Sequence, residues 1–256
     1  MNNKRKTSGV IIIGNEILSG KTIDTNSNYI TKELSIRGVD VKEISIIQDI
    51  EENIINIVKL FSENYDYVFT TGGIGPTHDD ITTESIAKAF DKKLVINNEA
   101  KELLEKHYNI NERTSARFKM AILPEKAVLI YNPVSVAPGF YIKNVFVFPG
   151  VPRIMKAMFY EFIDGFLEKK ILPQKQISTI LPEGVISDYI SKKQEENKEV
   201  LIGSYPYFKN QNFGVSIVLK GENINNLEKI CLEIFEYLTK KMENQKFSNT
   251  TSLISF

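Results

Sequence analysis

The chain has 256 residues, of which 42% are hydrophobic, so it is long enough for one large domain or for a main domain with a smaller partner, and disorder is not expected. Its 32 Lys and Arg balance 32 Asp and Glu, which gives no overall charge to attract a nucleic acid or an anionic membrane. The single cysteine, Cys231, excludes a disulfide framework and a Cys-rich metal site, and indicates a cytoplasmic location.

The N-terminal residues place basic side chains ahead of apolar ones, as a signal peptide does, but the apolar run VIII is too short for one. Residues 8–14 (SGVIIIG) are therefore predicted to form a buried strand. No run in the sequence approaches the length of a membrane-spanning helix, so we expect no membrane partner.

Short β-rich runs alternate with helical patterns in the first half of the chain, which is typical of α/β folds with a mostly parallel sheet. Ile54, Ile57, Val58 and Phe61 recur at the i, i+3, i+4, i+7 spacing of one helix face. The other elements predicted here are strands at 41–47 and 65–71 and a helix at 25–38 that Gly38 ends. We therefore expect a three-layer α/β/α domain.

The stretch TTGGIGPTHDD, residues 70–80, directly follows the strand predicted at 65–71. Thr82 is predicted to cap the helix that follows, with Glu84 in its first turn. Glycines between a strand and a helix suit a phosphate, because backbone N–H groups there favour anions, but a purely structural turn stays open. The stretch is neither a Walker A loop nor a GxGxxG fingerprint.

Later elements complete the first domain and indicate a second. We predict a helix at 98–108, strands at 136–142 and 145–148, and a helix that begins at Pro152. The charged connector at 168–176 suggests a boundary, so the domains are expected at residues 1–170 and 171–243, with a loosely held tail at 244–256. The second domain is expected to be a small α+β domain whose last helix, 224–242, carries an apolar stripe.

Carboxylates follow several of the predicted parallel strands. Asp79 and Asp80 lie in the glycine stretch, and two carboxylates would repel a phosphate unless a divalent cation stood between them. Glu16 and Asp49, with Asp24 and Asn26, would reach the same edge if the sheet is parallel. The sequence therefore favours a metal site, although a cap or turn role is open for each residue.

Four stretches, GNEILSGKTIDTN, TTGGIGPTHDDIT, NPVSVAPGF and FPGVP, resemble in order and spacing the MoaB/Mog-type molybdopterin-binding domain. The resemblance is to the version found in competence/damage-inducible protein A (CinA) and in the hydrolase-like N-terminal domain of eukaryotic FAD synthases, over about residues 8–165. IGSYPYF and the strand and helix after it look like the small second domain of these proteins. The resemblance implies a stand-alone form without the C-terminal amide hydrolase domain of full CinA proteins.

The resemblance implies functional roles for the residues of this chain at positions that match the family's motifs. It implies catalytic roles for Asp80, Asp49 and Lys119, with Lys119 neutralising a phosphate. It implies a metal bound by Asp79, Asp80, Glu16 and Asp49. The ligand or its phosphate would meet Gly72, Gly73, Gly75, Pro76, Thr77, Asn26, Pro138 and Gly139. Ile154 departs from the family, which has an acidic residue there, and Asn15 stands where many relatives have threonine.

The leading hypothesis is a nucleotide pyrophosphatase that hydrolyses the diphosphate of FAD or ADP-ribose. Its expected cofactor is a divalent cation, Mg²⁺, Mn²⁺ or Co²⁺, with K⁺ as a further candidate. Two alternatives stay open: a molybdopterin adenylyltransferase-like enzyme of molybdenum cofactor synthesis, and a non-catalytic nucleotide- or molybdopterin-binding protein. We expect a homo-oligomer, a dimer rather than a trimer, in which the second domain serves dimerisation or closure of the site.

Overall fold

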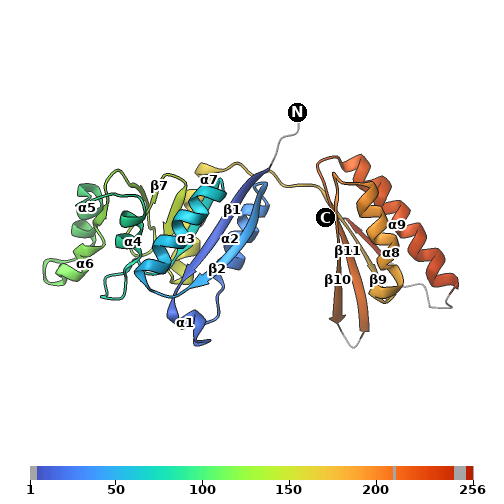
Figure 1. Cartoon of the computed structure of the whole chain (residues 1–256), viewed down its shortest axis with the longest axis horizontal. Coiled ribbons are helices and arrows are strands. Elements are labelled where there is room, and N and C mark those ends of the chain that lie inside the picture. The colour runs from blue at the N-terminus through green and yellow to red at the C-terminus, as the bar shows by residue number, and fades with distance from the viewer. Residues whose placement is uncertain (1–4, 210–211, 245–251, 256) are drawn as a thin grey trace. The chain divides into compact units, whose positions relative to one another are not determined.

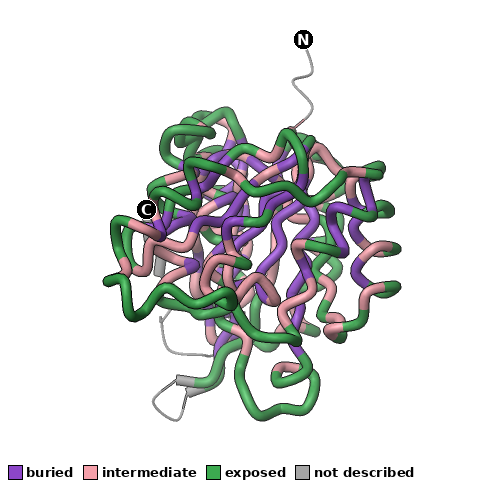
Figure 2. Tube along the Cα trace, turned by 90° about the vertical axis from the view of Figure 1, so that its left-hand side faces the viewer, coloured by how far each residue is buried: buried purple, intermediate pink, exposed green. Residues whose placement is uncertain are grey.

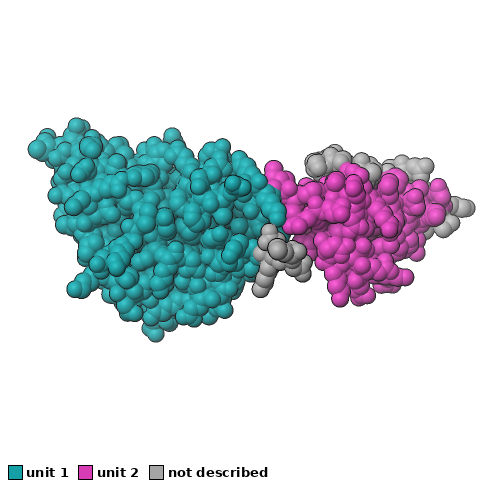
Figure 3. All heavy atoms as spheres, turned by 90° about the horizontal axis from the view of Figure 1, so that it is seen from above, with its two compact units in different colours: residues 1–170 teal, residues 171–256 magenta. Residues whose placement is uncertain are grey.

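The computed structural model describes residues 5–209, 212–244 and 252–255. The chain divides into two compact units, residues 1–170 and residues 171–256 (Figure 3). Within the described residues, no helix combines the length and the apolar character needed to cross a bilayer.

A six-stranded sheet forms the centre of the first unit, in the order β2-β1-β3-β8-β7-β6. The first four strands in this order are mutually parallel, and β7 and β6 are antiparallel to their neighbours. The bounds are β1 (Lys6–Ile13), β2 (Val39–Ile47), β3 (Tyr67–Thr71), β6 (Val128–Ile130), β7 (Gly139–Ile142) and β8 (Val145–Phe148).

Helices cover both faces of this sheet, which gives the predicted three layers (Figure 1). Strand β1 shows why: Val10 and Ile12 pack with α2 (Asn26–Ser35) and α7 (Pro152–Phe166), whereas Ile11 and Ile13 pack with α3 (Glu51–Asn64) and α4 (Thr82–Ala89). Successive side chains of a strand point to opposite faces, so a continuous apolar run serves two cores. The buried segments run through the interior of the tube, and exposed residues lie on its outside (Figure 2).

The segment between α4 and β6 contains elements that the sequence did not predict. β4 (Leu94–Ile96) and β5 (Ile122–Pro124) form a two-stranded antiparallel sheet. Between them lie α5 (Asn98–His107), which matches the helix predicted at 98–108, the 3₁₀ turn η1 (Ile110–Glu112) and α6 (Ser115–Lys119). Asn97 caps α5 by accepting a hydrogen bond from the N–H of Ala100 at 2.9 Å. A further short helix, α1 (Asn15–Leu18), follows β1.

The second unit is a four-stranded antiparallel sheet in the order β10-β11-β9-β12 with two helices, as expected for a small α+β domain. Its elements are β9 (Gln174–Thr179), α8 (Glu183–Glu196), β10 (Leu201–Lys209), β11 (Asn212–Lys220), α9 (Ile224–Asn244) and β12 (Ser252–Ser255). The predicted apolar stripe of α9 is buried and includes Cys231, the pKa of whose thiol is raised by burial.

Three local predictions need correction. Thr82 does not cap α4: the N-cap position is Ile81, and the N–H of Thr82 donates to the carbonyl of Gly73 at 2.9 Å instead. Helix α2 ends at Ser35, three residues before Gly38, which takes a φ of 72°. In the predicted tail, residues 252–255 pair with β9 as a strand, whereas residues 245–251 and 256 lie outside the described residues.

Candidate functional site

The carboxyl ends of β1, β2, β3 and β8 meet at one edge of the parallel sheet, because all four strands run in the same direction. A cavity of about 400 Å³ opens at this edge, here named the carboxylate cavity. Its walls come from the segments that follow these four strands: Ile13, Glu16, Thr22, Asp49, Gly72, Gly73, Ile74, Gly75, Asp79, Asp80 and residues 149–152. The structure thus brings together all four carboxylates that were predicted to bind a metal.

Gly72 and Gly73 let the chain turn sharply at the end of β3. Their φ angles are 111° and 67°, a region that glycine adopts most readily. A Cβ atom on Gly72 would lie 2.0 Å from the carbonyl oxygen of Ile13. The N–H of Gly72 donates to the carbonyl of Phe148 at 3.0 Å. The first two glycines are therefore a steric requirement of the turn that forms the cavity wall.

Thr77 fixes the two aspartates at the end of the loop. Its N–H donates to Oδ2 of Asp80 at 2.8 Å, and its hydroxyl lies within hydrogen-bond distance of Oδ2 of Asp80 and of Oδ1 of Asp79. A hydroxyl has one hydrogen, so it donates to one carboxylate at a time. The hydrogen bond from Thr77 is the main cause that lowers the pKa of Asp79.

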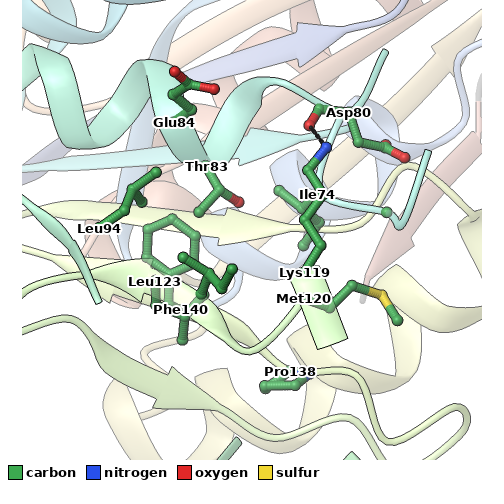
Figure 4. A pocket seen from close by; sticks show the side chains of 12 residues that line it. Ile74, Asp80, Thr83, Glu84, Leu94, Lys119, Met120, Leu123, Pro138 and Phe140 are labelled. Atoms are coloured by element: carbon green, nitrogen blue, oxygen red, sulfur yellow. Dashed lines mark hydrogen bonds between the residues drawn. The ribbon is translucent and has the colours of Figure 1, made fainter. Parts of the chain in front are cut away.

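Lys119 holds the same loop from α6. Its Nζ donates to the carbonyl oxygens of Thr77 and Asp80, both at 2.8 Å. Figure 4 shows the bond to Asp80. The family resemblance implied that this ammonium group neutralises a phosphate. In the structure it braces the backbone of the loop that carries Asp79 and Asp80.

Asp49 lies half-buried at the end of β2, where its Oδ2 accepts a hydrogen bond from the N–H of Asn15 at 2.8 Å. Burial is the main cause that raises the pKa of this carboxyl, and the charges of Glu16 and Asp79 raise it further. A bound cation would offset this repulsion between Asp49 and the neighbouring carboxylates.

Asn26 is buried and ties two strand ends together. Its Nδ2 donates to Oγ1 of Thr71 at 2.9 Å and to the carbonyl of Gly150 at 2.8 Å. Its Oδ1 is buried without a hydrogen-bond partner in the described part of the chain. Asp24 accepts hydrogen bonds from the N–H groups of Asn26 and Ser27, so the cap role left open for Asp24 is the one the structure shows.

The remaining predicted ligand residues lie outside the carboxylate cavity. Pro76 and Thr77 are on the loop with His78, and Thr77 and His78 are exposed. Gly139 is buried at the start of β7, where a Cβ atom would lie 2.3 Å from the carbonyl oxygen of Val147. Pro138 lines a second cavity.

This second cavity, here named the apolar cavity, has a volume of about 220 Å³ (Figure 4). It shares Ile74, Gly75 and Asp80 with the carboxylate cavity, so the loop forms a wall common to both. The other residues that line it are Thr83, Glu84, Leu94, Lys119, Met120, Ile122, Leu123, Pro138 and Phe140.

Sequence reasoning missed two parts of the site. Residues 149–152 close one side of the carboxylate cavity. They belong to the FPGVP stretch that carries the resemblance, but none of them was assigned to the ligand. Part of the wall of the apolar cavity comes from β4, β5 and the end of α6. These elements are three to five residues long and carry no clear periodicity.

The donor set of the carboxylate cavity fits a hard divalent cation that the ligand helps to bind. Asp49, Asp79 and Asp80 each use one carboxylate oxygen in hydrogen bonds to described residues, and Mg²⁺ prefers oxygen ligands. Across the described residues, however, no three His, Cys, Asp or Glu side chains are grouped closely enough to hold a metal alone. Mg²⁺ commonly completes its shell with waters and substrate phosphates, which suits such a partial set.

Two family models match the chain. The model described as a probable molybdopterin binding domain matches residues 9–169. The model described as the middle domain of FAD synthase matches residues 172–246.

Similar proteins come from archaea, bacteria and animals. A protein of Archaeoglobus fulgidus is 39% identical over 77% of this chain and 84% of its own length. A CinA-like protein of Fusobacterium nucleatum is 38% identical over 70% of this chain, and a probable FAD synthase of Caenorhabditis elegans is 31% identical over 92% of it. The matched regions span 45% and 50% of the length of these last two relatives.

A solved structure of the protein CinA, of unknown function, from Thermoplasma acidophilum has the same architecture as the first unit. It superposes with a TM-score of 0.60 and 34% sequence identity, over 63% of this chain and 98% of that chain. The predicted α/β fold with a mostly parallel sheet is thus confirmed by the strand order and by this neighbour.

Proposed function

The chain belongs to the family of probable molybdopterin binding domains, and from this premise and the strand-end cavity we propose that it is a metal-dependent hydrolase of the diphosphate bond in FAD or ADP-ribose. A relative named probable FAD synthase supports a nucleotide as the first ligand to consider.

One observation carries the proposal: Glu16, Asp49, Asp79 and Asp80 line a single cavity with the glycine turn. Backbone N–H groups of such a turn suit phosphate oxygens, whereas the carboxylates would repel them. A divalent cation between the carboxylates and a diphosphate resolves this conflict. A merely structural turn would not need four acidic side chains around one cavity.

The cation would be held by one or two of the four carboxylates of Asp79, Asp80, Glu16 and Asp49, together with phosphate oxygens of the substrate. When bound, it would polarise a phosphoryl oxygen and lower the pKa of an attacking water. Among the protein groups, we assign the proton of that water to Asp49, a half-buried carboxyl whose pKa is raised mainly by burial. Thr77 and Lys119 would keep Asp80 in place from the side chain and the backbone.

The test incubates the purified full chain with FAD, ADP-ribose or ATP, each with Mg²⁺, Mn²⁺ or Co²⁺ and with or without K⁺, and separates the products by chromatography. We expect cleavage of one diphosphate that chelation of the metal abolishes. Asp80→Asn should lower the rate by about 100-fold or more, because it removes a carboxylate that would hold the cation, whose charge stabilisation is worth several kcal/mol. Asp91→Asn, at an exposed acidic residue outside both cavities, is the matched control.

A second candidate is adenylyl transfer to molybdopterin, favoured by the description of the family model that matches residues 9–169. It predicts that ATP is consumed only when molybdopterin is present and that an adenylylated pterin is formed. If neither reaction occurs while nucleotides bind tightly, the chain is a binding protein and the hydrolase proposal is wrong.

A further inference from the structure

The hairpin of β10 and β11 extends beyond the rest of the sheet in the second unit. Pairing of β11 with β9 ends at Val215 and Thr179, whereas pairing of β11 with β10 continues past Phe213 and Phe208. Val215 is buried in the core of this unit. Phe213, the next residue on the same face of β11, is 76% exposed, and its cross-strand partner Phe208 is 63% exposed. The apolar face of the hairpin therefore continues beyond the buried core.

A groove with a volume of about 600 Å³ lies at these two rings, here named the hairpin groove. It is lined by residues 206–208 and 213–215 of the hairpin and by residues 180–183, which lead from β9 into α8. The ring centroids of Phe208 and Phe213 are 4.5 Å apart, so the two rings form one continuous apolar surface. This volume is within the range of about 300–1,000 Å³ that is usual for ligand pockets.

Glu183, in the first turn of α8, is the only charged residue among the described residues that line the hairpin groove. Its Oε1 accepts a hydrogen bond from the hydroxyl of Ser204, which holds the side chain against β10. Its Oε2 has no hydrogen-bond or ion-pair partner in the described part of the chain. A fixed carboxylate without a cation of its own complements a ligand that carries a positive charge.

The outer edge of β10 is closed to an added β-strand. β10 is the first strand in the order β10-β11-β9-β12, so alternate backbone groups point away from the sheet. Gln194 of α8 occupies two of these groups: its Oε1 accepts the N–H of Ile202, and its Nε2 donates to the carbonyl of Val200, both at 2.8 Å. Pro206, an even number of residues after Ile202 and therefore on the same side, has no N–H. A ligand of the hairpin groove is therefore not expected to bind by extending the sheet.

We propose that the hairpin groove binds an extended, proline-rich peptide segment of another protein that carries a lysine or an arginine. Such a segment forms a polyproline II helix, which needs no hydrogen bonds from a sheet edge and binds aromatic-lined grooves through its proline rings. Phe208 and Phe213 supply the aromatic surface, and Glu183 pairs with the basic residue. The inference does not depend on the proposed hydrolase, because the groove shares no residue with the carboxylate cavity or the apolar cavity.

The test measures binding of labelled peptides to the full chain by fluorescence anisotropy. Two proline-rich peptides carry one arginine, at the N-terminal end in one and at the C-terminal end in the other. An alanine-rich peptide with the same arginine lacks the polyproline II conformation. We expect at least one of the proline-rich peptides to bind and the alanine-rich peptide to bind at least tenfold more weakly.

A matched pair of variants tests the aromatic surface. Phe208→Ser removes a ring of the groove and should weaken binding of the proline-rich peptide by about tenfold, as expected for an aromatic contact residue. Tyr205→Ser is the control. Tyr205 is 59% exposed on the same strand, but it points to the other face and does not line the groove. Both residues are mostly exposed, so the fold should tolerate both changes.

Glu183→Gln tests the charge, because glutamine keeps an oxygen for the hydroxyl of Ser204. It should weaken the arginine peptide by about two- to fivefold, the range of an exposed ion pair, and leave a peptide with glutamine in place of arginine unchanged. Hydrolysis of ADP-ribose, measured in the same variants, should stay at the wild-type level whether that level is high or zero. A failure of the hydrolase proposal is thus distinguishable from a failure of this one.

The inference is overturned if neither proline-rich peptide binds the wild-type chain or if the alanine-rich peptide binds equally well. Equal losses in Phe208→Ser and Tyr205→Ser would also overturn it. Sedimentation of the same variants tests whether a second copy of this chain occupies the groove. A Phe208→Ser chain that changes its oligomeric state but not its affinity for the peptide would assign the groove to self-association and contradict the proposal.

Discussion

At the residue scale, Gly72 has a role that can be separated from its place in a family motif. Its φ is 111°, and a Cβ atom added there would lie 2.0 Å from the carbonyl oxygen of Ile13, which leaves no room for a side chain. We predict that Gly72→Ala costs at least about 3 kcal/mol of unfolding free energy, because strain in φ adds to a backbone overlap. Thermal and urea unfolding measure this loss.

Gly20 provides the control for this prediction. It has a φ of 72°, but a Cβ atom there would meet nothing within 4 Å. Gly20→Ala should therefore cost only about 1 kcal/mol, from the positive φ alone. Equal losses at the two positions would mean that the overlap at Gly72 relaxes easily and that the glycine is not a steric requirement.

Asp49 is predicted to reduce stability in favour of function. Its raised pKa means that the folded state holds the proton more tightly than the unfolded state, so stability falls as pH rises from the ordinary value of 3.8 through the folded pKa. Asp49→Asn carries no charge and keeps an oxygen for the N–H of Asn15. We predict that it is more stable than the wild type at pH 7, by well under about 1 kcal/mol because the group is half-exposed.

The same variant should lose hydrolysis by about 100-fold or more if Asp49 is the base. Melting curves at pH 7 and pH 3 check the stability, and the difference between variant and wild type should disappear at the lower pH. A variant that is less stable at pH 7 would show that the hydrogen bond to Asn15 outweighs the burial of the charge.

At the element scale, a side-chain clamp joins the starts of β1 and β3. Oδ2 of Asp66 accepts the N–H of Thr7 at 2.8 Å, and its Oδ1 accepts from Nζ of Lys6 at 2.7 Å. The hydrogen bond from Lys6, followed by that from Thr7, lowers the pKa of Asp66 to about 2. A lowered pKa stabilises the fold above the ordinary value of 3.8, and this contribution is lost as pH falls through about 2.

We therefore predict that Asp66→Asn costs about 0.5–1 kcal/mol at pH 7, a modest value because the pair is exposed to solvent. The gap between variant and wild type should close between pH 4 and pH 2. A double-mutant cycle with Lys6→Met separates the ion pair from the backbone hydrogen bond. A gap that persists at pH 2 would assign the effect to packing instead of charge.

The elements that the sequence predicted well are those that one strong local signal determines. The run around Ile11 and Ile13 is buried on both faces, and Pro152 begins α7 as its fixed φ favours. Strand β4 lacks such a signal because all three of its residues are exposed. The part of the apolar cavity that β4 and β5 form could therefore not be predicted.

The parts of the candidate site that depend on contacts between residues far apart in the sequence could not be predicted. The parallel sheet was enough to bring Glu16, Asp49 and Asp80 to one edge. The partners of Lys119 are carbonyl groups 42 and 39 residues earlier in the chain, and no local pattern indicates them. The resemblance implied a phosphate contact for Lys119, and its hydrogen bonds to these carbonyl groups were not predicted.

At the scale of the whole molecule, each unit has hydrophobic cores of its own. Two hydrophobic clusters, one around Ile11 and one around Val10, contain only residues of the first unit. A third cluster, around Ile217, contains only residues of the second unit. The residues that line the carboxylate cavity and the apolar cavity all lie before residue 153. Folding of the first unit and assembly of its site thus depend on contacts within residues 1–170.

We therefore predict that residues 1–170 fold cooperatively alone and bind AMP, a product of the proposed cleavage, with a dissociation constant within about threefold of that of the full chain, a difference below about 0.7 kcal/mol. Circular dichroism melting and calorimetry check the two parts. Sedimentation of both forms tests the proposed dimer: the full chain should sediment as a dimer and residues 1–170 as a monomer if the second unit dimerises. A folded fragment that binds AMP more than tenfold more weakly would instead show that the second unit closes the site, because no residue of either cavity has been removed.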